Sequence, residues 1–555
     1  MKNKYTYNAE QFPREQITGD LAYIDLICLD ILWRRGFRSE SAIKEFLYPS
    51  FSTVVTNTGF KDFDKAIAAL KSALTQHEKI IVYQDYDADG CCACAIAVEC
   101  LRTIGGNVGY YCNDRAVDGF GLCINGVDNI LEAHPDAKLI ITVDNGIVAN
   151  EAVAYANSKG LTVVITDHHE PGAVLPDAAA VVNAKRKDEE YPYHDFCGAG
   201  IIFKLMLELY RAMGQNLEPV LRTADIAALA TVADVVPLTG ENRAIVKEGL
   251  RLVADGTRPA FNALNRVMKP KVINAQRTLA FTYAPMVNAL SRMGKDPSLA
   301  VELLLSTDDN EAGEMVLQLK ALNEERKEAT EQEYQLAEEM IDPDNLPPVI
   351  VLYNEQFREG LVGIIAGRLK EKFNRPTVVF ADSNKREIKG SCRSTDELNI
   401  KEALDSITDH ILRHGGHAKA AGLSIAKSEL AAFTNAICDA AAPFVNGMAN
   451  VTAIDAVVTS EELTEQLIAE LRILEPYGEG FPEPLFGLTA NCNKVLYMGS
   501  EEQHAKLVDA EHKLSIIKWN AAEEFKKMDS LPKKFVGYPS LNEWHGDISV
   551  QFIVA

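Results

Sequence analysis

The chain has 555 residues, and its 79 acidic and 56 basic side chains give a formal net charge of −23 at pH 7. At roughly 100–200 residues per domain, this length predicts three or four domains. A composition of 47% hydrophobic and 24% charged residues excludes a disordered or fibrous chain. The acidic sum argues against unspecific binding of nucleic acid by the whole surface, although a local basic groove stays possible.

No apolar run approaches the roughly 20 residues that span a bilayer, and the N-terminus lacks the apolar stretch of a secretory signal. The eleven cysteines are an odd number, and the one CxxC pair, Cys91 and Cys94, has no second pair to complete a zinc site. We therefore expect buried, reduced cysteines in a cytoplasmic protein without membrane association.

In chain order, residues 1–75 show helical periodicity and predict an N-terminal helical extension. From Lys79, short apolar runs alternate with amphipathic stretches, which predicts a parallel sheet covered on both faces over 76–308. A long charged stretch almost free of Gly and Pro predicts a linking helix over 309–342. A smaller α/β domain follows over 343–445, and 446–555 contains strand-like pieces that predict a small β-barrel or sandwich.

The polar residues of the first domain are concentrated where its predicted strands end, which is where parallel sheets bind ligands. In chain order these residues are Asp85, Asp87, Asp89, Asp144, Asp167, His168, His169 and, after an apolar helix, Asp234. A single aspartate at a strand end is more often a helix cap than a ligand. Together, however, these side chains bring carboxylates and imidazole to one edge of one sheet.

The DxDxDG run from Asp85 also resembles the start of a calcium loop, but that loop needs a bidentate Glu at its twelfth position, which here is Ile96. Oxygen-rich ligation with a histidine favours Mn²⁺ or Mg²⁺ over zinc or copper. The cluster is large enough for two ions about 3.5–4 Å apart, an arrangement typical of phosphoester hydrolysis.

The motifs DYDADG, VDNG, DHH and ADVVPL, in this order, resemble the metal motifs of the DHH phosphoesterases. The segments NALSR (288–292), LNEER (322–326), GSCRS (390–394) and GGH (415–417) narrow the resemblance to RecJ-type single-strand-specific exonucleases. The resemblance covers essentially the whole chain. It implies a DHH domain joined by the long helix to a DHHA1 domain, with a C-terminal oligonucleotide-binding (OB) barrel. Gln84, Ser291 and Arg358 depart from the usual pattern, and none of them removes an implied metal ligand.

The resemblance also implies roles for individual residues. The implied metal ligands are Asp87, Asp89, Asp144, His168 and Asp234, and Asp85 is a weaker candidate. His169 would face the scissile phosphate, and Asp167 would orient a neighbour. The implied substrate-binding residues are Arg115, Asn288, Arg292, Ser391, Arg393 and His417.

The residues lead us to expect two-metal hydrolysis of a phosphoester. The resemblance implies that the substrate is single-stranded DNA, cleaved from its 5′ end to release mononucleotides in DNA repair or recombination. Two alternatives are a DHH-family phosphoesterase acting on pyrophosphate or short oligonucleotides, and a catalytically silent replication scaffold. The predicted barrel speaks against the first alternative, and the full set of implied ligands speaks against the second. A helicase or a single-strand-binding protein is a possible partner.

Overall fold

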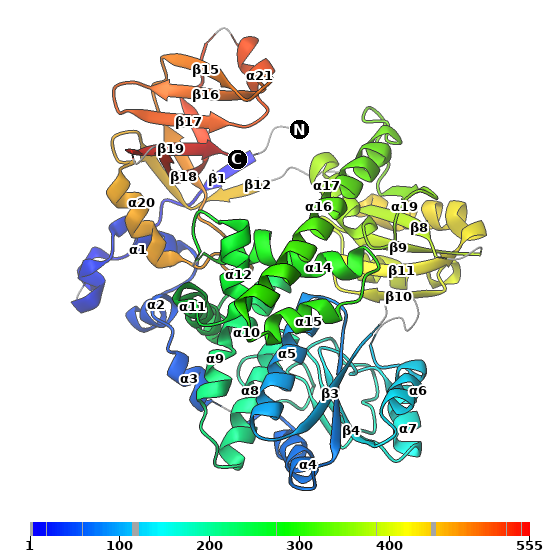
Figure 1. Cartoon of the computed structure of the whole chain (residues 1–555). Coiled ribbons are helices and arrows are strands. Elements are labelled where there is room, and N and C mark those ends of the chain that lie inside the picture. Colours follow the sequence, from blue (N-terminus) through cyan, green and yellow to red (C-terminus); the bar gives the residue numbers. More distant parts are fainter. Residues whose placement is uncertain are drawn as a thin grey trace. The chain divides into compact units, whose positions relative to one another are not determined.

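The computed structural model describes residues 4–17, 19–57, 59–113, 121–273, 275–383, 386–445, 451–528, 530–544 and 547–555. The chain forms two units (Figure 1). Unit 1 comprises residues 1–57, 235–248 and 449–555, and unit 2 comprises 58–234 and 249–448. In the described part of the chain, no helix has both the length and the apolar character needed to cross a membrane.

The first domain of unit 2 is built on a parallel sheet, as the strand–helix alternation predicts. Its strands lie in the order β3 (Asn107–Cys112), β2 (Lys79–Gln84), β4 (Ala137–Val143), β5 (Thr162–Thr166) and β6 (Ala180–Val182). Every neighbouring pair in this sheet is parallel. The helices that accompany it are α4 (Phe63–Thr75), α5 (Ala88–Thr103), α6 (Ile124–Ala133), α7 (Asn150–Ser158) and α8 (Gly198–Ala212).

Both faces of this sheet are buried. Ile81 and Tyr83 belong to the core that the sheet shares with α6 and α7, whereas Ile80 and Val82, pointing the opposite way, are equally inaccessible to solvent. Helices α4, α5 and α8 pack against the sheet strands, and Figure 1 shows α5 and the α6–α7 pair on opposite sides of β3 and β4. The polar residues that follow β2, β4 and β5 therefore lie at the carboxyl edge of this sheet, beyond its two apolar faces.

A helical layer follows the sheet. Its elements are α9 (Glu218–Arg222), α10 (Ala224–Ala233), α12 (Pro259–Met268), α13 (Gln276–Thr278), the π-helical turn Leu279–Tyr283, α14 (Ala284–Arg292), α15 (Ser298–Leu305) and α16 (Asp309–Glu339). Helix α16 packs on α12, α14 and α15 and then on α17. It thus joins the two α/β domains of unit 2, and its Tyr334 and Ala337 belong to the core of the second domain.

The second domain of unit 2 has a mixed sheet in the order β10-β11-β9-β8-β7. Only the β7–β8 pair is parallel among the described strands of this sheet. Its elements are β7 (Ile350–Tyr353), α17 (Val362–Phe373), β8 (Thr377–Asp382), β9 (Glu387–Arg393), α18 (Ile400–Asp405), the 3₁₀ turn Thr408–His410, β10 (Arg413–Gly416), β11 (Ala420–Ala426), the 3₁₀ turn Lys427–Glu429 and α19 (Leu430–Val445).

Unit 1 combines segments from both ends of the chain. Its N-terminal elements are β1 (Lys4–Tyr7), the 3₁₀ turns Arg14–Gln16 and Gly19–Tyr23, α1 (Leu26–Arg34), α2 (Glu40–Leu47) and α3 (Phe51–Thr56). Its C-terminal elements are β12 (Val451–Ile454), β13 (Ala456–Thr459), α20 (Glu465–Leu471), the 3₁₀ turn Arg472–Leu474, β14 (Phe486–Thr489), β15 (Lys494–Met498), β16 (His504–Asp509), β17 (Leu514–Lys518), α21 (Ala522–Lys526), β18 (Lys534–Trp544) and β19 (Asp547–Val554).

The sheet of unit 1 runs in the order β13-β14-β18-β19-β17-β16-β15. The N-terminal helices are not a separate body, because Leu29 and Ile31 of α1 share one hydrophobic core with Phe486 and Ile516 of this sheet. In addition, β1 pairs in parallel with β12. The sequence patterns do not reveal this association of the two chain ends.

The remaining segment of unit 1, residues 235–248, includes the N-terminal part of helix α11 (Gly240–Asp255). Its Arg243 is fully buried. The guanidinium donates to the carbonyl of Phe46 at 2.7 Å and to those of Leu474, Glu475 and Pro476 at 2.8 Å each. It also lies 3.8 Å from the centre of the Phe46 ring. Arg243 therefore ties all three segments of unit 1 together.

We predict that Arg243→Met destabilises unit 1 by at least about 3 kcal/mol, because several buried carbonyls lose their donor at once. Urea unfolding followed by circular dichroism measures the loss. The exposed Arg472 of the same unit provides the matched control, Arg472→Met, for which we expect little change. Equal stability of the two variants would contradict the role given to Arg243.

Candidate functional site

The aspartates after β2 are held by the start of helix α5. The Asp87 side chain caps α5 by accepting hydrogen bonds from the amides of Asp89 and Gly90, both at 3.0 Å. Gly90 allows the chain to turn tightly, since a Cβ there would lie 2.4 Å from the carbonyl oxygen of Asp85. The extended strand thus becomes a helix within a few residues, which keeps the three carboxylates of the DxDxDG run close together.

Asp89 is held by a second helix, α8. Its two carboxylate oxygens accept from the amides of Gly198 at 2.6 Å and Ala199 at 2.8 Å. These amides belong to the first turn of α8, which has no partners for them within the helix. The positive end of the helix also favours a carboxylate at this place.

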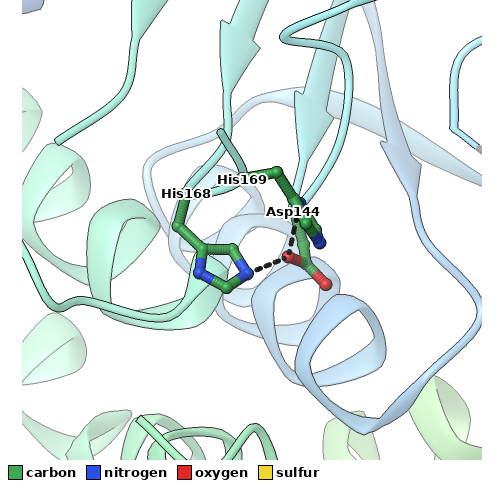
Figure 2. A group of neighbouring side chains, drawn as sticks. All are labelled: Asp144, His168 and His169. Carbon is green, nitrogen blue, oxygen red and sulfur yellow. Dashed lines mark ion pairs between the residues drawn. The ribbon is translucent and has the colours of Figure 1, made fainter. Parts of the chain in front are cut away.

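Asp144 follows β4 and occupies the centre of the cluster. Its backbone is left-handed, with φ of 63°, a conformation that non-glycine residues rarely adopt outside constrained sites. Figure 2 shows that both imidazoles approach this one carboxylate. His168 Nε2 lies 3.1 Å and His169 Nδ1 lies 3.9 Å from Asp144 Oδ1.

Asp167, at the end of β5, orients the histidines. Its Oδ1 accepts from the His168 amide at 2.7 Å and the His169 amide at 3.0 Å, and it lies 2.7 Å from His169 Nδ1. Its Oδ2 accepts from the amide of Ile147 at 2.9 Å. Both oxygens are therefore occupied within the protein, and Asp167 is in none of the side-chain groups with metal-binding geometry in the described residues.

The carboxylates and imidazoles form neighbouring groups whose potential ligand atoms lie within 4.8 Å of one another. These groups are Asp85, Asp87 and Asp144; Asp89, His168 and Asp234; and Asp144, His168 and His169.

These residues fit divalent cations. Asp85 Oδ1 and Asp144 Oδ1 are buried and accept no hydrogen bond, and Asp144 Oδ1 has only its ion-pair contacts with the two imidazoles. A buried carboxylate oxygen without a hydrogen bond is strongly disfavoured. A bound cation would satisfy both oxygens. The oxygen-rich donor set with one or two imidazoles matches Mn²⁺ or Mg²⁺.

The electrostatics of the cluster agree with this fit. Burial and the neighbouring charge of Asp87 raise the pKa of Asp85 to about 8 and that of Asp89 to about 6. Burial and nearby carboxylates also raise the pKa values of Asp144 and Asp234 well above the ordinary range. Without a cation, the site therefore resists full ionisation.

The two histidines differ in charge. Burial and the charge of His169 lower the pKa of His168 to about 3, so that its ring is neutral, as metal ligation requires. Burial alone would lower the pKa of His169, but the hydrogen bond and charge of Asp167 raise it to about 9. In the metal-free protein His169 is therefore a cation at neutral pH, and its side chain is 43% exposed.

Comparisons with known proteins agree with this geometry. Residues 79–231 match the DHH family, N-terminal domain; 346–442 match the DHHA1 domain; and 454–555 match the RecJ OB domain. The single-stranded-DNA-specific exonuclease RecJ of Salmonella typhimurium is 36% identical over 76% of this chain and 77% of that protein. The chain belongs to the RecJ family.

Other RecJ proteins give the same result. RecJ of Escherichia coli is 34% identical over 88% of this chain and 89% of its own length, and RecJ of Bacillus subtilis is 31% identical over 96% and 68%. The crystal structure of Thermus thermophilus RecJ in complex with Mn²⁺ matches with a TM-score of 0.85 at 30% identity, covering 99% of this chain and 78% of that one. These matches confirm the RecJ family and the order of DHH, DHHA1 and OB domains.

The residues implied for substrate binding in RecJ enzymes lie on several elements of unit 2. Asn288 accepts from the amide of Ala88 at 3.0 Å and so contacts the start of α5. Arg292 donates to the carbonyl of Gly360 at 3.3 Å, between the two α/β domains. Arg115 lies outside the described residues.

Three further candidates lie on the DHHA1 domain. Arg393 donates to Ser391 Oγ at 2.9 Å. His417, between β10 and β11, is exposed. Partial burial and the positive charges of Lys185 and His169 lower its pKa, which places it within electrostatic range of the metal-site edge of the DHH domain. The structure thus brings the acids and imidazoles into one cluster, and it places the substrate candidates on other elements of the same unit.

The sequence alone does not identify the N-terminal amides of α8 as part of the site. The available signal is the Gly198-Ala199-Gly200 run at the start of an otherwise bulky helix. Small residues there indicate close packing, but they do not reveal that the partner is Asp89, since the two segments are 109 residues apart.

We predict that the metal-free protein loses stability as the pH rises from 6 to 8. Asp85 binds its proton more tightly in the folded protein, with a pKa of about 8, than an unperturbed aspartate at 3.8, so its contribution falls across this window. In EDTA, the free energy of unfolding of Asp85→Asn, relative to that of the wild type, should therefore rise by on the order of 1–2 kcal/mol between pH 6 and 8. Denaturant unfolding at both pH values measures this difference.

The exposed Asp136 supplies the control, Asp136→Asn, which should follow the wild type at both pH values. Saturating Mn²⁺ should remove the advantage of Asp85→Asn, because a bound ion stabilises the folded wild type. A pH-independent gain would mean that charge at position 85 is not the cause.

Proposed function

We propose that this chain hydrolyses single-stranded DNA from the 5′ end and releases mononucleotides at the carboxylate–imidazole cluster of its DHH domain. The observation that carries the proposal is the pair of adjacent ligand groups, Asp85, Asp87 and Asp144 beside Asp89, His168 and Asp234. The family match supports the same reaction, since the curated relatives are single-stranded-DNA-specific exonucleases. The enzyme is a metal-dependent hydrolase that uses Mn²⁺ or Mg²⁺.

In this proposal, Asp87 would hold one ion and Asp89 the other, and Asp144 would be a ligand common to both sites. His168 and Asp234 would complete the second site, and Asp85 would support the first. When bound, such ions supply a hydroxide nucleophile and stabilise the attacking and leaving oxygens of the phosphodiester. The protein holds the ligands rigidly through the α5 and α8 amides and through the left-handed backbone of Asp144.

His169 provides positive charge for the substrate. Asp167 holds its Nδ1 and keeps the ring oriented, which leaves Nε2 for the scissile phosphate. A cation at this place stabilises the negative charge that grows on the phosphate in the transition state. In this proposal, Asp167 orients His169, and His169 contacts the reacting group.

The DHHA1 domain is proposed to bind the 5′ end. Arg393 and Ser391 lie together at the start of α17, where a Cβ on Gly363 would be 3.1 Å from both side chains. A guanidinium, a hydroxyl and the first turn of a helix form a suitable receptor for a terminal phosphate. Asn288, Arg292, His417 and Arg115 are proposed to hold the strand between this place and the metal cluster.

The match to the RecJ OB domain supports binding of the single strand by unit 1, since OB folds bind such strands. A helicase or single-strand-binding protein that supplies unwound DNA belongs to the same proposal. We also propose a cytoplasmic location. The eleven free cysteines support it, because disulfides are rare in that reducing compartment.

The first test uses a 5′-phosphorylated single-stranded oligonucleotide labelled at its 3′ end, with Mn²⁺. The wild type should give a ladder of progressively shortened labelled products. Asp144→Asn, which tolerates the left-handed backbone, should reduce the rate by more than about 100-fold, exceeding the loss usual for residues that only support ligands. A matching duplex should stay intact, and an undiminished rate in the variant would contradict the proposal.

A second test addresses the 5′ end. Arg393→Met should lower the preference for a 5′-phosphorylated over a 5′-hydroxyl oligonucleotide by about tenfold or more, the value of one charge-assisted hydrogen bond. The ratio of the two kcat/KM values measures this preference. Arg413→Met, at a side chain that is 76% exposed on the same sheet, should leave the ratio unchanged. Equal ratios in all three proteins would place the 5′-phosphate elsewhere.

A further inference from the structure

Gly198, the first residue of helix α8, lies between two proposed metal ligands. Cys197, which precedes it, occupies the N-cap position of α8, but its side chain does not cap the helix. The cap comes instead from Asp89, whose two oxygens accept from Gly198 and Ala199. The orientation of the Asp89 carboxylate is therefore determined by the position of the α8 N-terminus.

Gly198 also lies against Asp144. A Cβ on Gly198 would lie 2.5 Å from Asp144 Cβ, 2.8 Å from its Oδ1 and 2.9 Å from its Cα, all closer than Cβ atoms approach other atoms in real structures. Gly198 therefore donates its amide to Asp89, and its lack of a side chain allows Asp144 to pack closely against it. The two carboxylates come from different strand–helix junctions, and Gly198 lies between them.

We propose that Gly198 is a positioning residue that sets the separation between Asp89 and Asp144, and with it the geometry in which the cluster binds its ions. The inference deepens the proposed function and rests on it, because both carboxylates are ligands only in that proposal. A methyl group at position 198 must displace either Asp144 or the start of α8, whose amides hold the Asp89 carboxylate by hydrogen bonds. Either movement widens the gap between the two ligands.

The close approach at Gly198 differs from that of the other glycine in the same turn. The three atoms nearest to a Cβ on Gly200 would all belong to Phe196, the first of them a ring carbon at 3.0 Å. Both glycines are buried in the same helix, so an alanine has similar intrinsic effects on the helix at each position. The pair therefore separates an effect on the ligands from a general effect on packing.

The experiment is calorimetric titration of the wild type, Gly198→Ala and Gly200→Ala with Mn²⁺ alone, without DNA. Gly198→Ala should bind Mn²⁺ about 10–100-fold more weakly, the range for residues that orient metal ligands. Gly200→Ala should bind as the wild type does. Wild-type affinity in Gly198→Ala would overturn the inference alone, whereas a wild type that binds no Mn²⁺ would overturn the proposed function as well.

A second measurement covers the case in which Gly198→Ala folds poorly. Asp144→Gly removes the atoms that the new methyl meets first and suits the left-handed backbone, so Gly198→Ala should lower the Tm in EDTA less in this background than in the wild type. An equal loss of Tm in both backgrounds would show that Asp144 is not the neighbour that Gly198 accommodates, and would overturn the inference.

Discussion

Repulsion between carboxylates held out of water is the constraint on which the site depends. Asp85, Asp89 and Asp144 are each at most 4% exposed, and they meet at one edge of a parallel sheet together with Asp234. Burial, and then the neighbouring carboxylates, raise the pKa of each acid, so the folded chain favours full ionisation only when cations are bound among them. Ion binding is therefore part of the energetics of this fold, as well as part of its chemistry.

The surrounding elements reduce this repulsion without removing it. The N-terminus of α5 faces Asp87 and that of α8 faces Asp89, so that two helix ends place partial positive charge beside two of the acids. Asp167 takes its hydrogen bonds from backbone amides and His169, and burial leaves His168 neutral. Hydrogen bonds thus orient Asp87, Asp89 and Asp167 before an ion arrives, which reduces the reorganisation that binding requires.

The sequence predicts those parts of the structure that depend on local pattern. Apolar runs that end in Asp or His place the strand ends correctly, and the run after Asp308 predicts the helix α16. The features that the sequence does not predict depend on contacts between residues far apart in the chain. Examples are the amide of Ala88 bonded to Asn288, the α8 amides bonded to Asp89, and the core shared by α1 and the C-terminal sheet. Strand β3, with Gly109 and two tyrosines, carries only a weak apolar signal.

The composition of unit 1 has a consequence for synthesis on the ribosome. Arg35 and Asp455 form a bidentate ion pair across 420 residues, and Cys28 bonds the carbonyl of Glu470 across 442. At about 5–20 residues per second, the N-terminal helices wait roughly 20–90 s for the rest of their core. Unit 2 can complete its sheets in that interval, while the apolar faces of α1 and α2 stay open to chaperones.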